Sequence, residues 1–504
     1  MRGPHNIWRL IRTGATFERA GALKYALEAM DAPMPLRVTA RVIGWPLQWL
    51  GLKGDLTQPP VLRAITALGP AYIKFGQLMS TRPDVVGPEL ANEMRVLQDA
   101  LPAFDTAIAK AEVEKELGIK IDDVFSSFSE PVAAASLAQV HKATIRETGQ
   151  VVAVKVLRPG IERAFMKDVD AFYLAAAIVD IFAPFARRLR PREVIKHFES
   201  VAVAELDLRM EASAAAEFAD NTRDDEGFSL PAVIWDLSSR RVMTTEWVEG
   251  VALGDVEAVL ATGQDPKEFA ARIMQTFLRH ALRDGFFHAD MHQGNLKRGP
   301  NGDLIALDFG IMGRIDTYTR RAYAEILMGF QNRDYRRVAE VHFEAGYVPA
   351  DQDVEAFAQA LRAVGEPIFG QNASNVSMAR VFGQLFTVTE TFGMQTRTEL
   401  ILLQRTMVVV EGVTRTFDPE MNMWDVSAPV IEKYIIDNIG PKAMMRDLVA
   451  TARVLSRFGP KLPQLAEAAL KNANKTPESA PRIQGWMWAA GGLIVGVVLA
   501  GLLG

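Results

Sequence analysis

Residues 285–310 decide the fold. They read Gly285-Phe-Phe-His288-Ala-Asp290-Met-His292-Gln-Gly294-Asn295 and, after residues 296–303, Leu304-Ile-Ala-Leu-Asp308-Phe309-Gly310. The apolar run before Asp308 is typical of a short strand that ends at this carboxylate. Phosphoryl transfer requires one carboxylate to orient a nucleophile, and an amide with a second carboxylate to hold Mg²⁺ on phosphate groups. We therefore expect Asp290 to be catalytic, and Asn295 and Asp308 to be metal ligands.

The order and spacing of these residues are similar to the protein-kinase signature His-x-Asp-x4-Asn followed by Asp-Phe-Gly, without the arginine before the aspartate. That arginine commonly reads an activation-loop phosphate. No Ala-Pro-Glu motif follows Gly313, and no phosphosite is evident there. The pattern predicts chemistry on ATP with little provision for an extended protein substrate.

An alanine-rich loop and a strand lysine lie upstream, in the register of a kinase glycine-rich loop and its Val-Ala-x-Lys strand. Alanine largely forbids positive φ, so this loop should be stiffer than a glycine-rich one. The strand at 151–157 carries a lysine that can neutralise the α and β phosphates, and the strand at 241–250 is placed to supply an adenine-binding hinge. Besides the acidic partner of that lysine, the residues expected to bind ATP are Ala133, Ala134, Ala135, Ser136, Ala138, Val140, Lys155, Glu246 and Val248.

Lys155 needs a carboxylate to orient it, and we expect this group on a long helix over residues 191–222. The acidic residues of this alanine-rich stretch are Glu199, Glu205, Asp207, Glu211 and Glu217. Helical spacing puts Asp207 and Glu211 on one face and separates Glu205 from Asp207. Spacing alone does not choose the partner of Lys155.

Composition excludes several classes of function. The 504 residues are too many for one ordinary domain, and the net charge is −5. No Lys/Arg-rich block or aromatic RNA-binding signature is present, so we expect no nucleic-acid partner. The absence of cysteine rules out disulfides, thiolate metal sites and a cysteine nucleophile.

The end of the sequence, Trp486 to Gly504, holds nineteen uncharged residues. At about 1.5 Å per residue they span roughly 28 Å, enough for a transmembrane helix. Basic residues precede this stretch and none follows, which predicts a single-pass anchor in the cell inner membrane with the catalytic part in the cytoplasm. Gly492 and Gly496 would let two such helices pack closely, so a homodimer is an alternative to ordinary glycine content.

Taken together, the motifs resemble the UbiB/ADCK family of atypical kinase-like proteins over about residues 20–430, plus the terminal anchor. Met291 and Gln293 depart from the family pattern, in which prolines are expected. The residues that carry the resemblance are Lys74-Phe-Gly76-Gln77, Ala133–Ser136, Lys155, Glu205-Leu-Asp207, His288-Ala-Asp290, Asn295 and Asp308-Phe-Gly310.

The resemblance changes the interpretation of Lys74, which by itself is typical of a lysine that reaches solvent from an apolar helix. It implies regulatory Lys74-x-Gly-Gln77 and Glu205-x-Asp207 motifs that point into the active site. Lys74 would meet Glu205 while Glu211 pairs with Lys155, and the swapped pairing stays open.

The fold class implied is α+β: a bilobal protein-kinase-like fold with an N-terminal helical extension and a C-terminal transmembrane helix. The expected domains are the extension (1–118), the N-lobe (119–250), the C-lobe (251–430), further helices and a linker (431–484) and the anchor (485–504).

The function implied is a Mg²⁺-dependent ATPase that supports ubiquinone biosynthesis by making lipophilic precursors accessible. Its partners would be membrane lipid, quinone-pathway intermediates and other ubiquinone-biosynthesis proteins. A small-molecule or protein kinase and a nucleotide-sensing scaffold remain alternatives. A polyprenylphenol hydroxylase is less favoured, because no flavin motif, haem-ligating cysteine or two-His-carboxylate iron site is visible.

Overall fold

The computed structural model describes most of the chain. It describes residues 5–29, 45–80, 86–94, 103–135, 137–182, 190–370, 378–394 and 397–440, with the single positions 34, 38, 97, 443, 445 and 449. The chain divides into two compact units, Met1–Tyr434 and Ile435–Gly504. All the elements below lie in the first unit, except the last residues of the final helix.

An antiparallel sheet in the order β1-β2-β3-β5 carries the strand lysine. Its strands are β1 (Phe125–Ala134), β2 (Ala138–Ile145), β3 (Val151–Leu157) and β5 (Val242–Glu246). Val152, Val154 and Val156 of β3 are fully buried on one face. Because side chains alternate along a strand, Lys155 lies on the opposite face.

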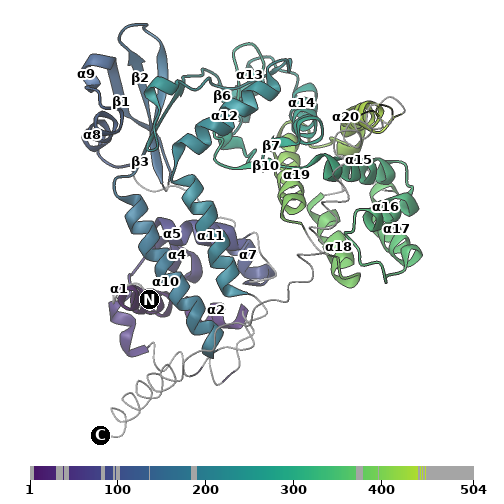
Figure 1. Ribbon diagram of the computed structural model, residues 1–504, viewed down its shortest axis with the longest axis horizontal. Helices are drawn as coiled ribbons and strands as arrows, with labels where there is room; N and C mark the ends of the chain where they lie inside the picture. Colours follow the sequence, from purple (N-terminus) through teal and green to yellow (C-terminus); the bar gives the residue numbers. More distant parts are fainter. Residues whose placement is uncertain are drawn as a thin grey trace, which may run out of the picture. The chain divides into compact units, whose positions relative to one another are not determined.

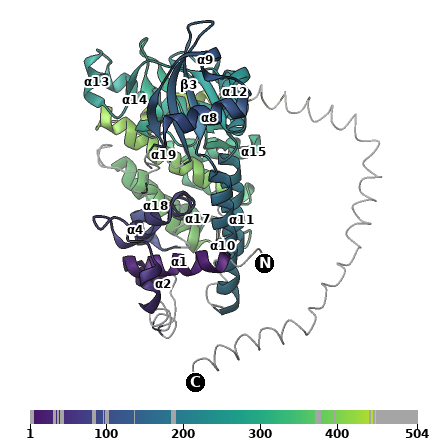
Figure 2. The same ribbon diagram turned by 90° about the vertical axis from the view of Figure 1, so that its left-hand side faces the viewer.

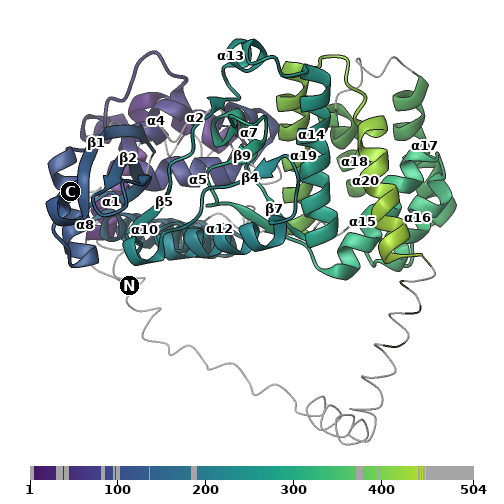
Figure 3. The same ribbon diagram turned by 90° about the horizontal axis from the view of Figure 1, so that it is seen from above.

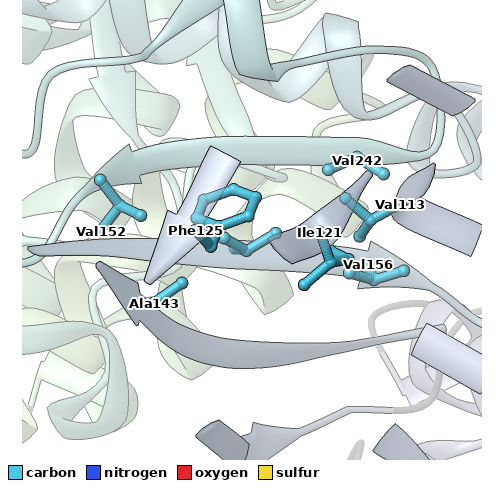
Figure 4. Packing of buried hydrophobic residues seen from close by; sticks show 8 residues of the cluster. Val113, Ile121, Phe125, Ala143, Val152, Val156 and Val242 are labelled. Carbon is cyan, nitrogen blue, oxygen red and sulfur yellow. The ribbon is translucent and has the colours of Figure 1, made fainter. Parts of the chain in front are cut away.

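The buried face of this sheet is covered by α8 (Thr106–Leu117) and α9 (Ile121–Val124). Figure 4 shows Val113 and Ile121 from these helices near Val156 of β3 and Val242 of β5, with Val152 at the other end of the cluster. This apolar core fixes β3, and with it the position of Lys155.

A helical layer forms a second part of the unit (Figures 1 and 2). Its centre is a cluster of aromatic rings that joins α5, α10 and α11, with Phe75 and Phe165 both packed against Phe198. α1 packs on α10 and α4. The elements are α1 (His5–Ala20), α2 (Ala22–Ala29), η1 (Trp45–Leu50), α4 (Pro60–Leu68), α5 (Pro70–Ser80), α7 (Pro88–Met94), α10 (Ile161–Phe182) and α11 (Pro191–Glu205).

The long helix expected over 191–222 is two helices, α11 and α12 (Leu208–Thr222). The chain leaves the helical conformation at Leu206, and Asp207 begins α12 as its N-cap, accepting a hydrogen bond from the Arg209 N–H at 3.1 Å. Aspartate is a favoured N-cap, which explains the break inside an alanine-rich stretch.

Short strands and turns surround residues 285–310. They form a four-stranded sheet in the order β4-β9-β8-β6 and a pair, β10-β7. Gly285 has a φ of 65°, and a Cβ there would meet the Ile315 carbonyl, so this turn needs glycine. The elements are β4 (Phe228–Ser229), η3 (Trp235–Leu237), β6 (Val251–Ala252), α13 (Val256–Ala261), α14 (Pro266–Arg279), the π-helix η4 (His280–Asp284), β7 (Phe286–His288), η5 (Gln293–Asn295), β8 (Leu296–Arg298), β9 (Leu304–Ala306) and β10 (Met312–Arg314).

Helices complete the described chain, and Figure 3 shows them grouped beside α14. Consecutive helices pack on one another from α15 to α19, and α19 also lies against α14 and β10. They are α15 (Thr317–Gln331), α16 (Tyr335–Glu344), α17 (Val354–Gly370), α18 (Met378–Thr391), α19 (Thr398–Phe417) and α20 (Met423–Asn438).

The architecture is α+β, but the expected C-terminal transmembrane helix needs correction. Residues 485–504 lie outside the described residues. Within the part of the chain that is described, no helix has the length and apolar character to cross a membrane. The longest of these helices, α10 and α19, carry several charged side chains, which are costly in hydrocarbon. The structure therefore does not support the single-pass inner-membrane anchor, or the localisation inferred from it.

Candidate nucleotide-binding site

Lys155 is held between two carboxylates. Its Nζ lies 2.6 Å from Glu211 Oε1 on α12 and 3.3 Å from Asp308 Oδ2. Lys155 and Glu211 are mostly buried, whereas the Asp308 side chain is 45% exposed. The structure thus resolves the pairing that the sequence left open, since Glu205 does not contact Lys155 but pairs with Lys74.

Burial and mutual attraction set the charges of this group. Burial opposes the charged form of Lys155, but Asp308 and Glu211 outweigh it and raise the pKa of the lysine. Burial also opposes ionisation of Asp308. Lys155, the Gly310 N–H and His288 together outweigh that effect and hold the Asp308 pKa well below its usual range. Burial raises the pKa of Glu211. A lysine cation and an ionised Asp308 therefore face each other at neutral pH.

Asp308 is delivered by the buried strand β9. The N–H of Leu307, the first residue after β9, donates to the Asn295 carbonyl at 3.0 Å, which joins this strand to the loop that holds Asp290. The Gly310 N–H donates to Asp308 Oδ1 at 2.9 Å. Phe309 is buried against Phe218 of α12, so the Asp-Phe-Gly turn is fixed by packing.

Asp290 is positioned by its own loop. Asn295 Nδ2 donates to the Asp290 carbonyl at 3.0 Å and to its Oδ2 at 3.2 Å. The Asp290 N–H donates to Nδ1 of the buried His288 at 3.1 Å. His292 Nε2 lies 3.6 Å from Asp290 Oδ2, while its Nδ1 accepts the Gly294 N–H at 3.0 Å. His292 was not among the expected site residues, although its position two residues after Asp290 was a usable indication.

The donor groups at this site fit Mg²⁺. The Nδ2 of Asn295 is used by Asp290, which leaves the amide oxygen as the acceptor available to a cation. Asp308 presents a half-exposed carboxylate. The described residues contain no group of three or more metal-ligating side chains. Mg²⁺ commonly takes one or two protein oxygens, with phosphate and water supplying the others.

The alanine-rich loop joins β1 to β2. Ala135 N–H donates to the Ala138 carbonyl at 2.8 Å, closing the turn. Arg158, just after β3, donates from Nη2 to the Ala135 carbonyl at 3.1 Å and from its N–H to Leu137 at 2.8 Å. No pattern in the sequence indicated that Arg158 holds this loop. Of the other loop residues, Ala133 and Ala134 end β1, Val140 on β2 is opposite Lys155, and Ser136 lies outside the described residues.

The Lys74-x-Gly-Gln77 segment lies on α5. Lys74 Nζ is 3.0 Å from Glu205 Oε2, with both side chains largely buried. A Cβ at Gly76 would crowd Leu97 and Ile65, so glycine allows α5 to pack closely. Gln77 Nε2 donates to the Leu97 carbonyl at 3.2 Å. Asp207 caps α12 and pairs with Arg209 at 2.6 Å.

The expected hinge residues, Glu246 and Val248, lie at the end of the edge strand β5 and just after it. Glu246 accepts hydrogen bonds from Gln150 Nε2 at 3.3 Å and from the Ala232 N–H at 3.2 Å. The Val248 carbonyl accepts from Lys297 Nζ at 3.2 Å.

A cavity of about 650 Å³ brings together most of the charged candidates. Two residues of α19, Glu399 and Leu402, also line it, and no local pattern in the sequence indicated them. Among the candidates, its wall includes Lys74, Ala135, Ala138, Lys155, Glu205, Glu211, Asp290 and Asp308; it does not include Gln77, Ala133, Ala134, Val140, Asp207, Glu246, Val248 or Asn295.

Comparison with known proteins supports a kinase-like fold. The ABC1 atypical kinase-like domain family matches residues 96–342, and the UbiB helical domain family matches residues 361–422. A protein named Probable protein kinase UbiB from Aliivibrio fischeri (strain MJ11) is 40% identical, covering 81% of this chain and 76% of its own. The chain belongs to the UbiB family of ABC1 atypical kinase-like proteins.

Two other relatives match the chain at similar identity. Proteins with the same name from Vibrio vulnificus (strain YJ016) and Edwardsiella ictaluri (strain 93-146) are 38% and 37% identical, covering 89% and 91% of this chain and 84% and 85% of their own lengths. A solved structure of Rv3197 with erythromycin, from Mycobacterium tuberculosis, is 23% identical, with a TM-score of 0.51. It covers 79% of this chain and 98% of that one, and it supports the fold alone.

Proposed function

We propose that this UbiB-family chain binds Mg-ATP in the cavity around Lys155 and Asp290, hydrolyses it, and thereby supports ubiquinone biosynthesis. The observation that carries the proposal is one cavity wall that holds a buried lysine, its two carboxylate partners and a separate, loop-held aspartate. Phosphoryl transfer needs one set of groups that neutralises the phosphate charge and a separate group that orients the nucleophile.

Each group of the chain has a distinct task. Lys155, oriented by Glu211, neutralises the charge of the triphosphate. Asp290 orients the attacking water and accepts its proton, with Asn295 fixing its carboxylate. Asn295 and Asp308 would hold Mg²⁺, which supplies charge neutralisation on the phosphates when bound. The hydrogen bond from Arg158 to the Ala135 carbonyl restricts the alanine-rich loop, which would cover the phosphates.

Hydrolysis is favoured over phosphorylation of a protein by the crowding of the cavity. The Lys74–Glu205 pair from α5 and α11 occupies part of the same wall. An extended peptide would have to displace this largely buried ion pair to reach Asp290. The relatives are nevertheless named as probable protein kinases, so transfer to another acceptor is the second candidate.

We propose ubiquinone biosynthesis as the pathway because the chain belongs to the UbiB family. We propose that turnover makes quinone-pathway intermediates accessible to other ubiquinone-biosynthesis proteins. The test is quinone-intermediate profiling in cells lacking this protein and complemented with the wild type or with Asp290→Asn. An early prenylated phenol should accumulate and disappear only with the wild type. Equal rescue by both would refute a need for turnover, and a phosphorylated product in a reconstituted assay would favour the kinase.

A further inference from the structure

The segment that follows Asp-Phe-Gly is short in this chain. Residues 311–316 read Ile-Met-Gly-Arg-Ile-Asp and lead directly into α15 at Thr317. They contain no serine, threonine or tyrosine, so this segment has no hydroxyl group to phosphorylate. In protein kinases, phosphorylation orders the corresponding loop through new contacts to arginine and helps to keep the strand lysine paired with its glutamate. A different interaction has to order the segment here.

Arg314 makes such an interaction. It lies on β10, and its guanidinium donates two hydrogen bonds to Glu217 on α12, from Nη1 to Oε1 at 2.7 Å and from Nη2 to Oε2. A bidentate contact of this kind fixes orientation as well as distance, which a lysine in the same place would not do. The ion pair therefore joins the strand after Asp-Phe-Gly to the helix that carries Glu211.

An aromatic ring of the neighbouring strand also holds the guanidinium. Arg314 is opposite Phe286 in the β10–β7 pair, and its Cζ lies 4.2 Å from the centre of the Phe286 ring. Phe286 is buried, whereas the Arg314 and Glu217 side chains are 65% and 41% exposed. Because solvent screens an exposed ion pair, this attraction of the cation to the ring adds to the force that keeps Arg314 beside Glu217.

Helix α12 contacts residues 308–314 at three places. The contacts are Glu211 with Asp308 through Lys155, Phe218 with Phe309, and Glu217 with Arg314. Glu211 and Glu217 are six residues apart on one helix, which is about 9 Å along its axis, and both line the cavity. Two attachments this far apart fix the direction of the helix. Loss of the outer one would let Glu211 turn away from Lys155.

We propose that Arg314 and Glu217 are positioning residues, whose ion pair keeps α12 against the Asp-Phe-Gly segment and so keeps Lys155 paired with Glu211 without phosphorylation. The carboxylate of Glu217 takes the place of a phosphate, with the arginine on the short segment and the anion on the helix. The effect on nucleotide binding rests on the proposed function, but the effect on α12 does not.

Charge reversal tests the ion pair. Arg314→Glu and Glu217→Arg each place two like charges together, and the double variant restores opposite charges with their positions exchanged. The matched control is Arg223→Glu, because Arg223 pairs with Asp220 of the same helix at 2.5 Å, is similarly exposed and does not line the cavity. Calorimetry measures the affinity for the non-hydrolysable nucleotide AMP-PNP with Mg²⁺. Amide hydrogen exchange of α12 is measured without nucleotide.

Each single reversal should raise the Kd for Mg-AMP-PNP roughly fivefold or more, and should speed amide exchange in α12 by a similar factor. The double variant should stay within about threefold of the wild type in both measurements, because the opposite charges are restored but the contact to Phe286 is lost. Arg223→Glu should change neither. Equal Kd values for Arg314→Glu and Arg223→Glu, or no recovery in the double variant, would overturn the role of the ion pair.

A double-mutant cycle shows how the ion pair acts. Glu211→Gln already lacks the buried carboxyl partner of Lys155. Adding Arg314→Glu to it should raise the Kd further by less than about twofold, because both changes act on the same contact. A full additional loss would mean that Arg314 acts on the nucleotide directly, and would refute the positioning role.

Failure of the proposed function gives a different result. A wild-type chain that does not bind Mg-AMP-PNP, while α12 exchanges faster in Arg314→Glu and recovers in the double variant, keeps the role of the ion pair and refutes the nucleotide site. Normal nucleotide binding in every variant, with unchanged exchange in α12, keeps the nucleotide site and refutes the role of the ion pair.

Discussion

Lys155 Nζ lies 2.6 Å from Glu211 Oε1, and this contact joins strand β3 to helix α12 in the wall of the 650 Å³ cavity. The same Nζ reaches Asp308 at 3.3 Å, with the Asp308 side chain more exposed than that of Glu211. A triphosphate that takes this lysine can replace the outer contact to Asp308 and leave the inner one intact. Glu211 is then the residue that keeps the lysine in place, and Asp308 becomes available to a cation.

Replacing the carboxyl group of Glu211 by an amide should weaken nucleotide binding. In Glu211→Gln the lysine cation loses its buried carboxyl partner, and we expect the Kd for Mg-ATP to rise about tenfold or more, because a hydrogen bond to a charged group is worth roughly 1.5–3 kcal/mol. Isothermal titration calorimetry measures the change. Asp220→Asn on the exposed side of α12 is the matched control, with its side chain 71% exposed. Equal affinities for the two variants would contradict the role of Glu211.

Asp290→Asn should separate binding from turnover. The amide cannot accept a proton, so ATP hydrolysis should fall by roughly 10²- to 10⁴-fold, whereas the Kd for Mg-ATP should change little. Steady-state phosphate release and calorimetry give the two quantities. Asp236→Asn, at an exposed position outside the cavity, controls for the loss of one charge. Turnover at the wild-type rate in Asp290→Asn would remove this residue from the chemistry.

Ala135→Gly should loosen the loop between β1 and β2. Ala135 is held at its N–H by Ala138 and at its carbonyl by Arg158, and glycine adds backbone freedom without removing either bond. We expect a severalfold shift in nucleotide affinity, or autophosphorylation detectable by mass spectrometry. Ala261→Gly at the exposed end of α13 is the control. If affinity is unchanged and no phosphate is incorporated, loop stiffness has no role.

The arrangement of residues 285–310 could be predicted from the sequence because it depends on local spacing. The spacing of Asp290 and Asn295 follows from one loop, and an apolar run predicts the strand that delivers Asp308. Lys155 was equally accessible, because alternation along β3 puts valines in the core and the lysine on the other face. These residues depend on a few neighbouring positions, so a pattern in the sequence can show them.

The partners of these residues depend on packing between distant segments. The sequence could not choose between Glu205 and Glu211, because the choice depends on the end of α11 and the capping of α12 by Asp207. Arg158 holds the alanine-rich loop by donating to the Ala135 backbone carbonyl. Every residue has such a carbonyl, so no residue type in the sequence indicates this contact. Glu399 reaches the cavity from a helix more than ninety positions after Asp308, and no spacing rule connects the two.

Acid should destabilise the chain in part through His342. Burial lowers its pKa to about 4, whereas an unfolded histidine titrates near pH 6.5. Between these values the unfolded chain binds a proton that the native chain does not, so the free energy of unfolding falls as the pH is lowered. For this one group the loss of free energy of unfolding from pH 7 to pH 5 is about 2 kcal/mol.

The variant His342→Phe should therefore lose less free energy of unfolding than the wild type over this range, as measured by urea unfolding at pH 7, 6 and 5. His197→Phe, on the exposed side of α11, should keep the wild-type dependence. Curves of equal slope for His342→Phe and the wild type would show that His342 is not a neutral, partly buried ring in the native state.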